Sequence, residues 1–220
     1  MNLFLTFITS LLLGMRHATD PDHIVAVSTI VSREQSVWKS SAIGALWGVG
    51  HTLTIFVVGG AIILFKLEFT PRLGLSMEFA VAIMLVVLGL LNVLDRSPFH
   101  SHPHEPAAPS VGRWRPFAIG VVHGLAGSAA ATLLILPLID DARWAALYLV
   151  VFGLGTIAGM AMITLAIAAP SAYASQRVAG LQRTIRMVSG AVSLVFGLYL
   201  GYRIGFVDGL FTADPRWTPS

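Results

Sequence analysis

The chain has 220 residues, of which 55% are hydrophobic and 11% are charged, with a formal net charge of +3 and a mean hydropathy of +0.78. Soluble domains carry about 25% charged residues, so this composition excludes a soluble globular domain and indicates an integral membrane protein. The small basic excess is typical of loops that set membrane topology and not of nucleic-acid binding, and the absence of cysteine excludes disulfides and thiolate metal ligands.

Six apolar segments are expected to cross the bilayer as helices, because each is close to the roughly 20 residues that span about 30 Å of hydrocarbon. We therefore predict an all-α integral membrane protein with about six transmembrane helices. The segments cover residues 2–31, 40–65, 75–94, 115–139, 144–169 and 184–206.

The first segment contains a cluster of ionisable residues in the stretch GMRHATDPDHIVAV, residues 14–27. Residues 2–13 alone are too short to span, so the crossing has to run through this stretch, which then lies at mid-membrane depth. Asp20 followed by Pro21 is typical of a helix N-cap and a first helical position, so we expect the helix to be broken near Pro21. Irregular backbone at this depth is tolerated where it lines a cavity.

Two later segments also place a histidine inside the membrane. His51 falls near the middle of the segment at 40–65, and His123 falls in the inner half of the segment at 115–139. Because ionisable groups are costly in lipid, we expect these histidines, like those of the first segment, to face a cavity lined by protein.

These polar residues suit a transition-metal ion. Imidazole and carboxylate ligands without thiolate favour first-row divalent ions such as Ni2+, Co2+ or Zn2+, whereas Ca2+ and Mg2+ favour oxygen ligands alone. Two carboxylates can also balance a double positive charge inside the membrane. The candidate ligands are His17, Asp20, Asp22, His23, His51 and His123.

Several of these residues have a structural alternative. Asp20 could serve only as a helix cap, and His123 alone could be an ordinary hydrogen-bonding residue between helices. Arg16 could be a counter-ion that locks the site when no metal is bound, or part of a structural salt bridge. Thr52 and Ser128 are supporting candidates, although such residues more often hydrogen-bond between helices than bind metal.

The second half of the chain repeats features of the first half, and the alignment superposes His17 on His123 and His51 on Thr156. Three spans in each half would invert one half relative to the other, an arrangement in which transporters bind their substrate near the membrane midplane. We predict a first three-helix repeat at 1–94 and a second at 115–206. The aligned pairs are GMRHATDPDHIVAV with GVVHGLAGSAAATL at 120–133, GVGHTL at 48–53 with GLGTIA at 153–158, and LGLL at 88–91 with FGLY at 196–199.

The loops between these segments predict the orientation. Basic residues are more numerous at 32–39, 95–114 and 170–183 than in the other loops, so the positive-inside rule places these three loops in the cytoplasm and both termini outside it. We expect a multi-pass protein of a bacterial inner membrane, with residues 207–220 as a short extramembrane tail.

The cytoplasmic linker at 95–114 is rich in proline and contains alternating histidines. His100, His102 and His104 could bind metal loosely in a flexible segment, or could belong to an ordinary solvated loop.

Three stretches resemble motifs of the nickel/cobalt transporter (NiCoT) superfamily. RHATDPDHI resembles its H-x4-D-H motif, which His17, Asp22 and His23 match, and GVGHTLTIF resembles a second motif, which supplies His51 and Thr52. VVHGLAGSAA is similar to the shorter urease-accessory membrane permeases of the superfamily. The resemblance implies transport of Ni2+ or Co2+ with His17, Asp22 and His23 at the selectivity site. The chain lacks the Phe-Asp-Thr-x-Thr-Glu type motif of the longer members.

The expected function is therefore a permease that moves Ni2+ or Co2+ through an intramembrane His/Asp site by alternating access. The ion is the transported substrate and no permanently bound cofactor is expected; a homo-oligomer is compatible with the sequence. One alternative is an intramembrane metal-dependent enzyme, although no general base stands out apart from the ligands. Another is a small-anion exporter, although two carboxylates would repel an anion and Arg16 is the only nearby cation.

Overall fold

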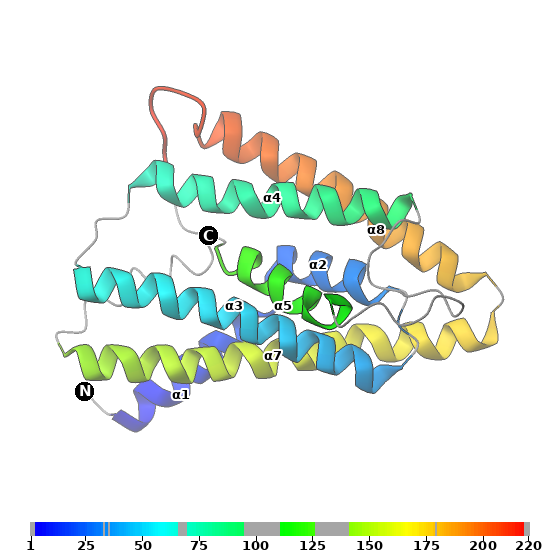
Figure 1. Cartoon of the computed structure of the whole chain (residues 1–220), viewed down its shortest axis with the longest axis horizontal. Coiled ribbons are helices and arrows are strands. Elements are labelled where there is room, and N and C mark those ends of the chain that lie inside the picture. Colours follow the sequence, from blue (N-terminus) through cyan, green and yellow to red (C-terminus); the bar gives the residue numbers. More distant parts are fainter. Residues whose placement is uncertain are drawn as a thin grey trace.

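The computed structural model describes residues 3–32, 34, 36–65, 70–94, 111–125, 141–178 and 180–217. All regular structure within these ranges is helical, which confirms the predicted all-α class (Figure 1). The elements are α1 (Leu3–His17), α2 (Pro21–Val31), α3 (Val37–Phe65), α4 (Pro71–Val93), α5 (Val111–His123), α7 (Ala142–Arg177), α8 (Leu181–Tyr202) and the π-helical turn η2 (Arg203–Val207).

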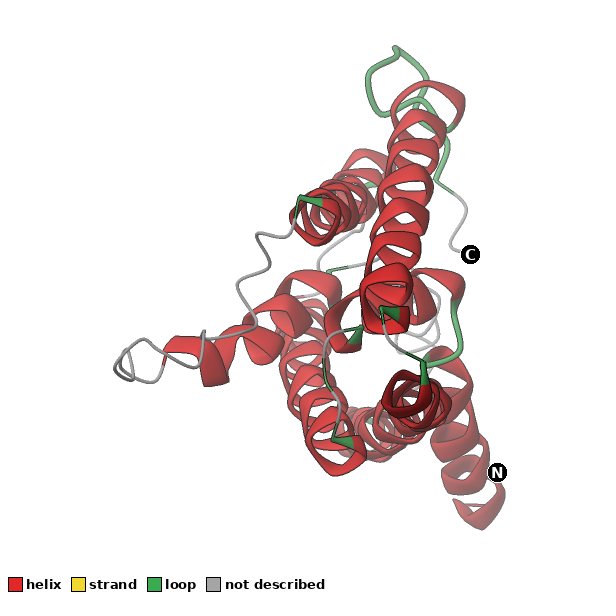
Figure 2. Ribbon diagram, turned by 90° about the vertical axis from the view of Figure 1, so that its right-hand side faces the viewer, coloured by secondary structure: helices red, strands yellow, loops and turns green. Residues whose placement is uncertain are grey.

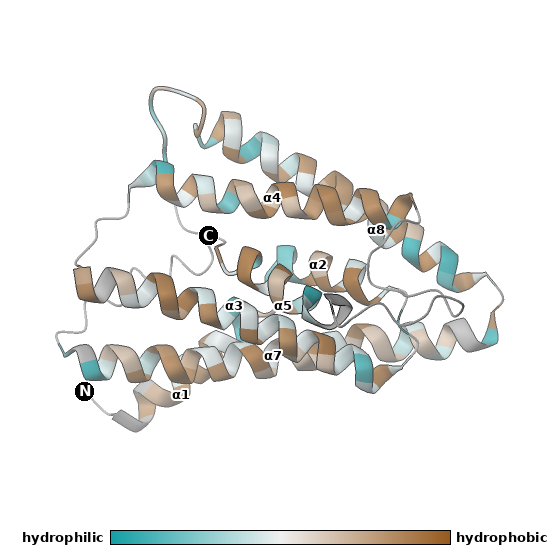
Figure 3. Ribbon diagram, in the orientation of Figure 1, coloured by the Kyte–Doolittle hydropathy of each residue, from teal (hydrophilic) through white to brown (hydrophobic). Residues whose placement is uncertain are grey.

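Four of these helical stretches are long and apolar enough to cross a membrane: Val37–Ala61, Pro71–Val93, Arg143–Ala174 and Leu181–Val207. They match the predicted segments at 40–65, 75–94, 144–169 and 184–206, so the chain is a multi-pass membrane protein. Hydrophobic residues dominate the middle of the long helices (Figure 3). Many large apolar side chains point outward, such as Val57 and Val195, which are 64% and 66% exposed, as expected for helices that face lipid.

The first predicted segment is broken, as expected from its Asp-Pro pair. Helix α1 ends at His17, a turn follows, and α2 begins at Pro21 with Asp20 in an extended backbone conformation at the N-cap position. The turn is closed by hydrogen bonds from the amides of Thr19 and Asp20 to the carbonyls of Arg16 and His17. Proline suits the first helical position, because its missing amide hydrogen would have no partner within the helix there.

The segment predicted at 115–139 also differs from a single continuous helix. Helix α5 begins earlier, at Val111, and ends at His123, where a turn leads to Leu125. The remainder of this predicted segment, from 126 to 139, lies outside the described residues. Two of the six predicted segments therefore contribute a helix that ends at a histidine.

The bundle is built from four close helix pairs, the most extensive of which is α3 with α7, and Figure 2 views it along its long helices. Helix α1 packs on α7, α5 packs on α3, and α4 packs on α8, while α2 lies against α4, α7 and α8. Glycines permit the close approach of the backbones, since a Cβ atom at Gly14 would overlap the carbonyl oxygen of Phe152, and one at Gly120 would overlap that of Trp47. Small residues thus set the positions of α1 and α5.

Asn92 of α4 fixes the C-terminal end of α2 within the bundle. Its side-chain amide donates to the Ser32 hydroxyl at 2.9 Å and lies 3.2 Å from the Thr29 carbonyl oxygen and 3.4 Å from the Ser189 hydroxyl of α8. These bonds join three helices through one buried residue. The N-terminal end of α2 therefore belongs to a helix whose C-terminal end is held in place by hydrogen bonds.

Candidate metal centre

The breaks in the helices bring four histidines together. His17 is the last residue of α1 and His123 is the last residue of α5, while His23 lies in the first turn of α2 and His51 lies in the middle of α3. His17 is 6% exposed and the other three are fully buried. The other three of the chain's seven histidines are the linker histidines, which lie outside the described residues.

His17 links α1 to α3 and to the turn that precedes α2. Its Nε2 atom lies 2.8 Å from His51 Nε2, and its Nδ1 atom lies 2.9 Å from Asp20 Oδ2. Two imidazole nitrogens at this distance either share one hydrogen or bind a common ion. If Asp20 accepts the Nδ1 hydrogen, then Nε2 keeps its lone pair and is a metal ligand.

Asp22 bridges two further histidines with its two carboxylate oxygens. Oδ1 lies 3.0 Å from His23 Nδ1, and Oδ2 lies 3.1 Å from His123 Nε2. Oδ1 also accepts a hydrogen bond from the backbone amide of His23 at 3.0 Å. Asp22 therefore joins α2 to α5 across the predicted repeats.

Several nitrogens in this cluster have no hydrogen-bond partner. Within the described part of the chain these buried atoms are His23 Nε2, His51 Nδ1, His123 Nδ1 and the indole nitrogen of the adjacent Trp47. A buried polar group without a partner costs about 1–3 kcal/mol. Imidazole nitrogens that are buried and unpaired are suited to bind a cation that completes their bonding.

Asp20 and Asp22 each contact one ring nitrogen of a histidine, an arrangement that is common at metal sites. Asp20 contacts the Nδ1 atom of His17, and Asp22 contacts the Nδ1 atom of His23, so the Nε2 atoms of both rings are left for other partners. Carboxylates in this position fix the tautomer and orientation of a ligating histidine and increase its basicity. The geometry thus gives Asp20 an orienting role toward His17.

The structure places the remaining predicted residues as follows. Asp20 occupies the N-cap position of α2, but its side chain makes no capping hydrogen bond. Arg16 is exposed, and both carboxylates contact histidines, so the expected pairing of Arg16 with Asp20 or Asp22 is not found among the described ion pairs. The Thr52 hydroxyl donates to the Gly153 carbonyl of α7 at 3.4 Å, which joins two helices. Ser128 lies outside the described residues.

Two aromatic residues beside the histidines were missed by the sequence analysis. The Trp47 ring centroid lies 5.4 Å from that of His23 and 5.2 Å from that of His123, and the Phe152 centroid lies 5.7 Å from that of His17. The repeat alignment that pairs GVGHTL with GLGTIA also pairs Trp47 with Phe152. That correspondence is the signal that could have found them.

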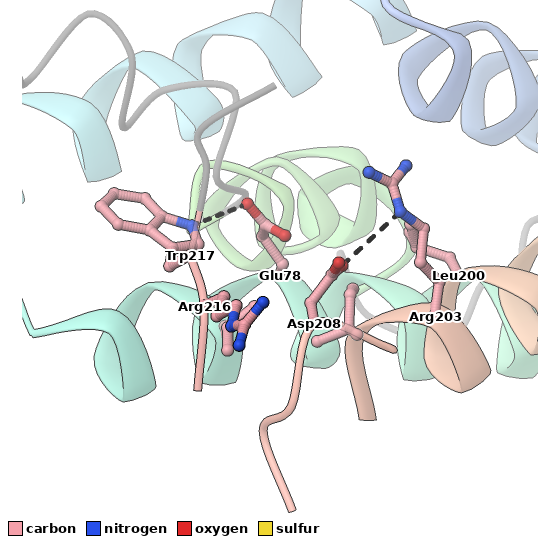
Figure 4. Close-up of a pocket in the computed structure, with 8 residues that line it drawn as sticks. Glu78, Leu200, Arg203, Asp208, Arg216 and Trp217 are labelled. Carbon is pink, nitrogen blue, oxygen red and sulfur yellow. Dashed lines mark hydrogen bonds and ion pairs between the residues drawn. The ribbon is translucent and has the colours of Figure 1, made fainter. Parts of the chain in front are cut away.

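A cavity of about 30 Å3 lies at the N-terminal end of α4, beside η2 and the C-terminal residues (Figure 4). The indole nitrogen of Trp217 donates to Glu78 Oε1 at 3.0 Å, and Arg203 Nε lies 3.5 Å from Asp208 Oδ2. The predicted extramembrane tail thus folds back onto α4 as far as Trp217, whose ring also packs on Gly74. No histidine lines this cavity.

Comparison with known proteins identifies the family. The urease accessory protein UreH of Bacillus sp. (strain TB-90) is 35% identical over 209 residues, which cover 90% of this chain and 91% of the relative. The chain belongs to this family of nickel/cobalt-transporter-type permeases. No protein-family model matches the chain, and no solved structure matches it significantly.

Two more distant relatives extend the family. A protein of Methanocaldococcus jannaschii, whose name provisionally describes a nickel/cobalt efflux system, is 23% identical over 202 residues, covering 87% of this chain and 90% of the relative. The chloroplast protein FOR GROWTH AND FERTILITY 1 of Arabidopsis thaliana is 27% identical over 212 residues, covering 86% of this chain and 57% of the relative. The names of the urease accessory and nickel/cobalt efflux relatives point to an accessory role or to transport, and not to catalysis.

Proposed function

We propose that this chain is a permease that transports Ni2+ or Co2+ through the buried histidine–aspartate site. The observation that carries the proposal is the clustering of four buried histidines with Asp20 and Asp22, three of the histidines with an unpartnered nitrogen, inside a bundle of apolar helices. A divalent first-row ion suits this donor set. The names of the urease accessory and nickel/cobalt efflux relatives support the same choice of ion.

Transport through such a site requires the ion to exchange water for protein ligands. The imidazoles replace part of its hydration shell, and Asp20 and Asp22 offset its double charge, which would otherwise be prohibitive among apolar helices. His23, His51 and His123 are fully buried, so an ion reaches them only when helices move apart. A binding site that is closed in this way supports alternating access, in which the ion is a transient substrate.

The packing of the helices supports two inverted halves. Helix α1 of the first half packs on α7 of the second, and α5 of the second packs on α3 of the first. The contacts are reciprocal in detail, because Gly14 meets the backbone at Phe152 and Thr156, and its counterpart Gly120 meets the backbone at Trp47 and His51. A two-fold relation between the halves would produce this exchange, and rocking of one half against the other would open the site to each side in turn.

For the cellular setting, we propose a bacterial inner membrane, with both termini outside the cytoplasm. The support is the basic character of the loops at 32–39, 95–114 and 170–183. The linker histidines would then face the cytoplasm, on the side where an ion enters or leaves the protein.

The test is metal flux through purified protein in liposomes. Uptake of radioactive nickel and cobalt is compared between the wild type, His17→Ala and Asp22→Asn, with Thr156→Val as the control. Thr156 is buried, aligns with His51, and hydrogen-bonds to the Phe152 carbonyl of its own helix at 3.0 Å. We expect flux to fall at least about tenfold in the two site variants, since loss of one group at a metal site costs about 10–100-fold, and to be unchanged in the control.

The outcomes also separate the alternative functions. Unchanged flux in both site variants would refute the proposed transport site. Metal-dependent turnover of a substrate by the purified protein, without metal flux, would favour an intramembrane enzyme. Movement of a small anion that is insensitive to Asp22→Asn would favour an anion exporter.

A further inference from the structure

The histidines and Asp22 form two overlapping groups of donor atoms, and His23 belongs to both. One group is His17, His23 and His51, and the other is Asp22, His23 and His123; within each group the donor atoms lie within 4.8 Å of one another. Over the described ranges of the chain, no group with this spacing contains all five residues. The cluster therefore offers two positions for an ion and not one.

Each group already contains a pair of atoms at the spacing of two ligands on one ion. Two donors at 2.0–2.1 Å from a metal lie about 2.9 Å apart at a right angle and about 3.4 Å apart at the tetrahedral angle. His17 Nε2 and His51 Nε2 are 2.8 Å apart, and Asp22 Oδ2 and His123 Nε2 are 3.1 Å apart. Little movement is needed to bind an ion at either position.

His23 lies between the two pairs. Its ring centroid is 4.6 Å from that of His17 and 5.0 Å from that of His51, and it is 4.3 Å from that of His123. Its Nε2 atom is buried without a partner. Because Nδ1 is occupied by Asp22, Nε2 is the potential metal ligand, and a rotation of this one side chain can bring it toward either pair.

Building on the proposed permease function, we propose that the transported ion occupies these two positions in turn, with His23 as the ligand common to both. The ion exchanges His17 and His51 for Asp22 and His123 while His23 stays bound. It therefore retains a protein ligand throughout the transfer, and the barrier that full rehydration would impose inside the bundle is avoided. Because His17, His23 and His51 belong to the first half and His123 to the second, the exchange moves the ion from a position built by the first half to one that both halves share.

The two positions differ in charge and in ligand type. The first holds the ion by three imidazoles, with Asp20 and Asp22 one hydrogen bond away behind His17 and His23. The second includes a carboxylate oxygen among the direct ligands. Cobalt bound by three nitrogens and cobalt bound by two nitrogens and an oxygen differ in their visible absorption, which gives each position its own signature.

The experiment is a titration of the purified full chain with Co2+, followed by visible absorption and by equilibrium dialysis. The variants are His51→Gln, which removes a ligand of the first position, His123→Gln, which removes a ligand of the second, and His23→Gln, which removes the shared one. Thr156→Val is the matched control, and gel filtration checks that every variant remains folded. Flux of radioactive cobalt in liposomes is measured in parallel.

We expect His51→Gln and His123→Gln each to bind one ion with affinity within about tenfold of the wild type, but with different spectra, while both lose at least tenfold in flux. His23→Gln is expected to lose at least 100-fold in affinity. Identical spectra and equal losses of affinity in the first two variants would overturn the two-position proposal in favour of one site. Two ions bound per wild-type chain would also overturn it, because the shared ligand admits one ion at a time.

Failure of the underlying function would look different. If the wild type neither binds nor moves Co2+ or Ni2+, the permease proposal itself fails, and the two-position proposal fails with it. If the wild type transports the ion but the variants behave as a single site, only the two-position proposal is lost.

Discussion

Replacing Gly120 by alanine tests whether the close contact of α5 with α3 positions His123. A Cβ atom at Gly120 would overlap the Trp47 carbonyl oxygen and would lie 3.0 Å from the His51 backbone nitrogen. Restoring ordinary contact requires α5 to move away from α3 by about 1 Å, given that non-bonded atoms prefer about 3.5–4.0 Å. Overpacking of this kind costs about 1–3 kcal/mol.

The shift would reach the metal centre because His123 lies one helical turn after Gly120. His123 Nε2 is 3.1 Å from Asp22 Oδ2, so a displacement of about 1 Å would break this contact. Alanine in place of glycine favours a helix by about 0.8–1.0 kcal/mol, which offsets part of the overpacking. We therefore expect Gly120→Ala to lower the melting temperature modestly and to lower Co2+ flux at least about tenfold, with affinity within about tenfold of the wild type, as for His123→Gln.

The matched control is Gly60→Ala on α3, because a Cβ atom there would meet nothing within 4 Å. Gly60→Ala should keep full affinity and flux and should be as stable as the wild type or slightly more so. Melting temperature, Co2+ affinity and flux are measured for both variants under the same conditions. If Gly120→Ala matches Gly60→Ala in affinity and flux, the reasoning that connects helix spacing to the metal centre is wrong.

Three further predictions follow from the contacts of the described residues. Asp20→Asn keeps an acceptor for His17 Nδ1 but removes its charge, so Co2+ flux in liposomes should fall about 10–100-fold, while affinity stays within about tenfold because the second position is intact; an unchanged flux would argue against the orienting role. Acidification from about pH 7.5 to about pH 5.5 should weaken Co2+ binding reversibly, because protons compete for imidazole nitrogens that bind metal only when neutral; binding that strengthens in acid would contradict histidine ligation. Trp217→Phe removes the donor to Glu78 and should cost about 1 kcal/mol in a thermal melt, and a Glu78→Leu background, which lacks the acceptor, should reduce that cost; equal costs in both backgrounds would exclude the hydrogen bond as the cause.

The break in the first helix could be predicted from local chemistry. Asp20 and Pro21 encode the start of α2 in two adjacent residues, since an aspartate favours the cap and a proline favours the first helical position. The end of α5 at His123 could not be predicted in the same way. Gly124, which follows it, has an ordinary negative φ and is needed because a Cβ atom there would lie 2.6 Å from the His51 carbonyl oxygen, and this contact exists only after the helices pack.

The candidate ligands could be named from the sequence, but their pairing could not. A hydropathy pattern shows that a histidine lies at membrane depth. Which histidine each aspartate contacts depends instead on side-chain rotamers and on the rotation of each helix about its axis. Arg16 illustrates the limit, because it is adjacent to His17 in sequence yet exposed in the structure. Asp20 and Asp22 are two residues apart, and one contacts a ring of α1 while the other reaches α2 and α5.

The ends of α1 and α5 at His17 and His123 have an electrostatic consequence that is independent of any side chain. A helix carries a partial negative charge of about half an electron at its C-terminus and an equal positive charge at its N-terminus. Among the helices that the structure describes, two C-termini and one N-terminus, that of α2, meet around the cluster, so these helix ends together create a field that attracts cations. This contribution does not depend on the protonation of any group, and by itself it favours a cation over a small anion.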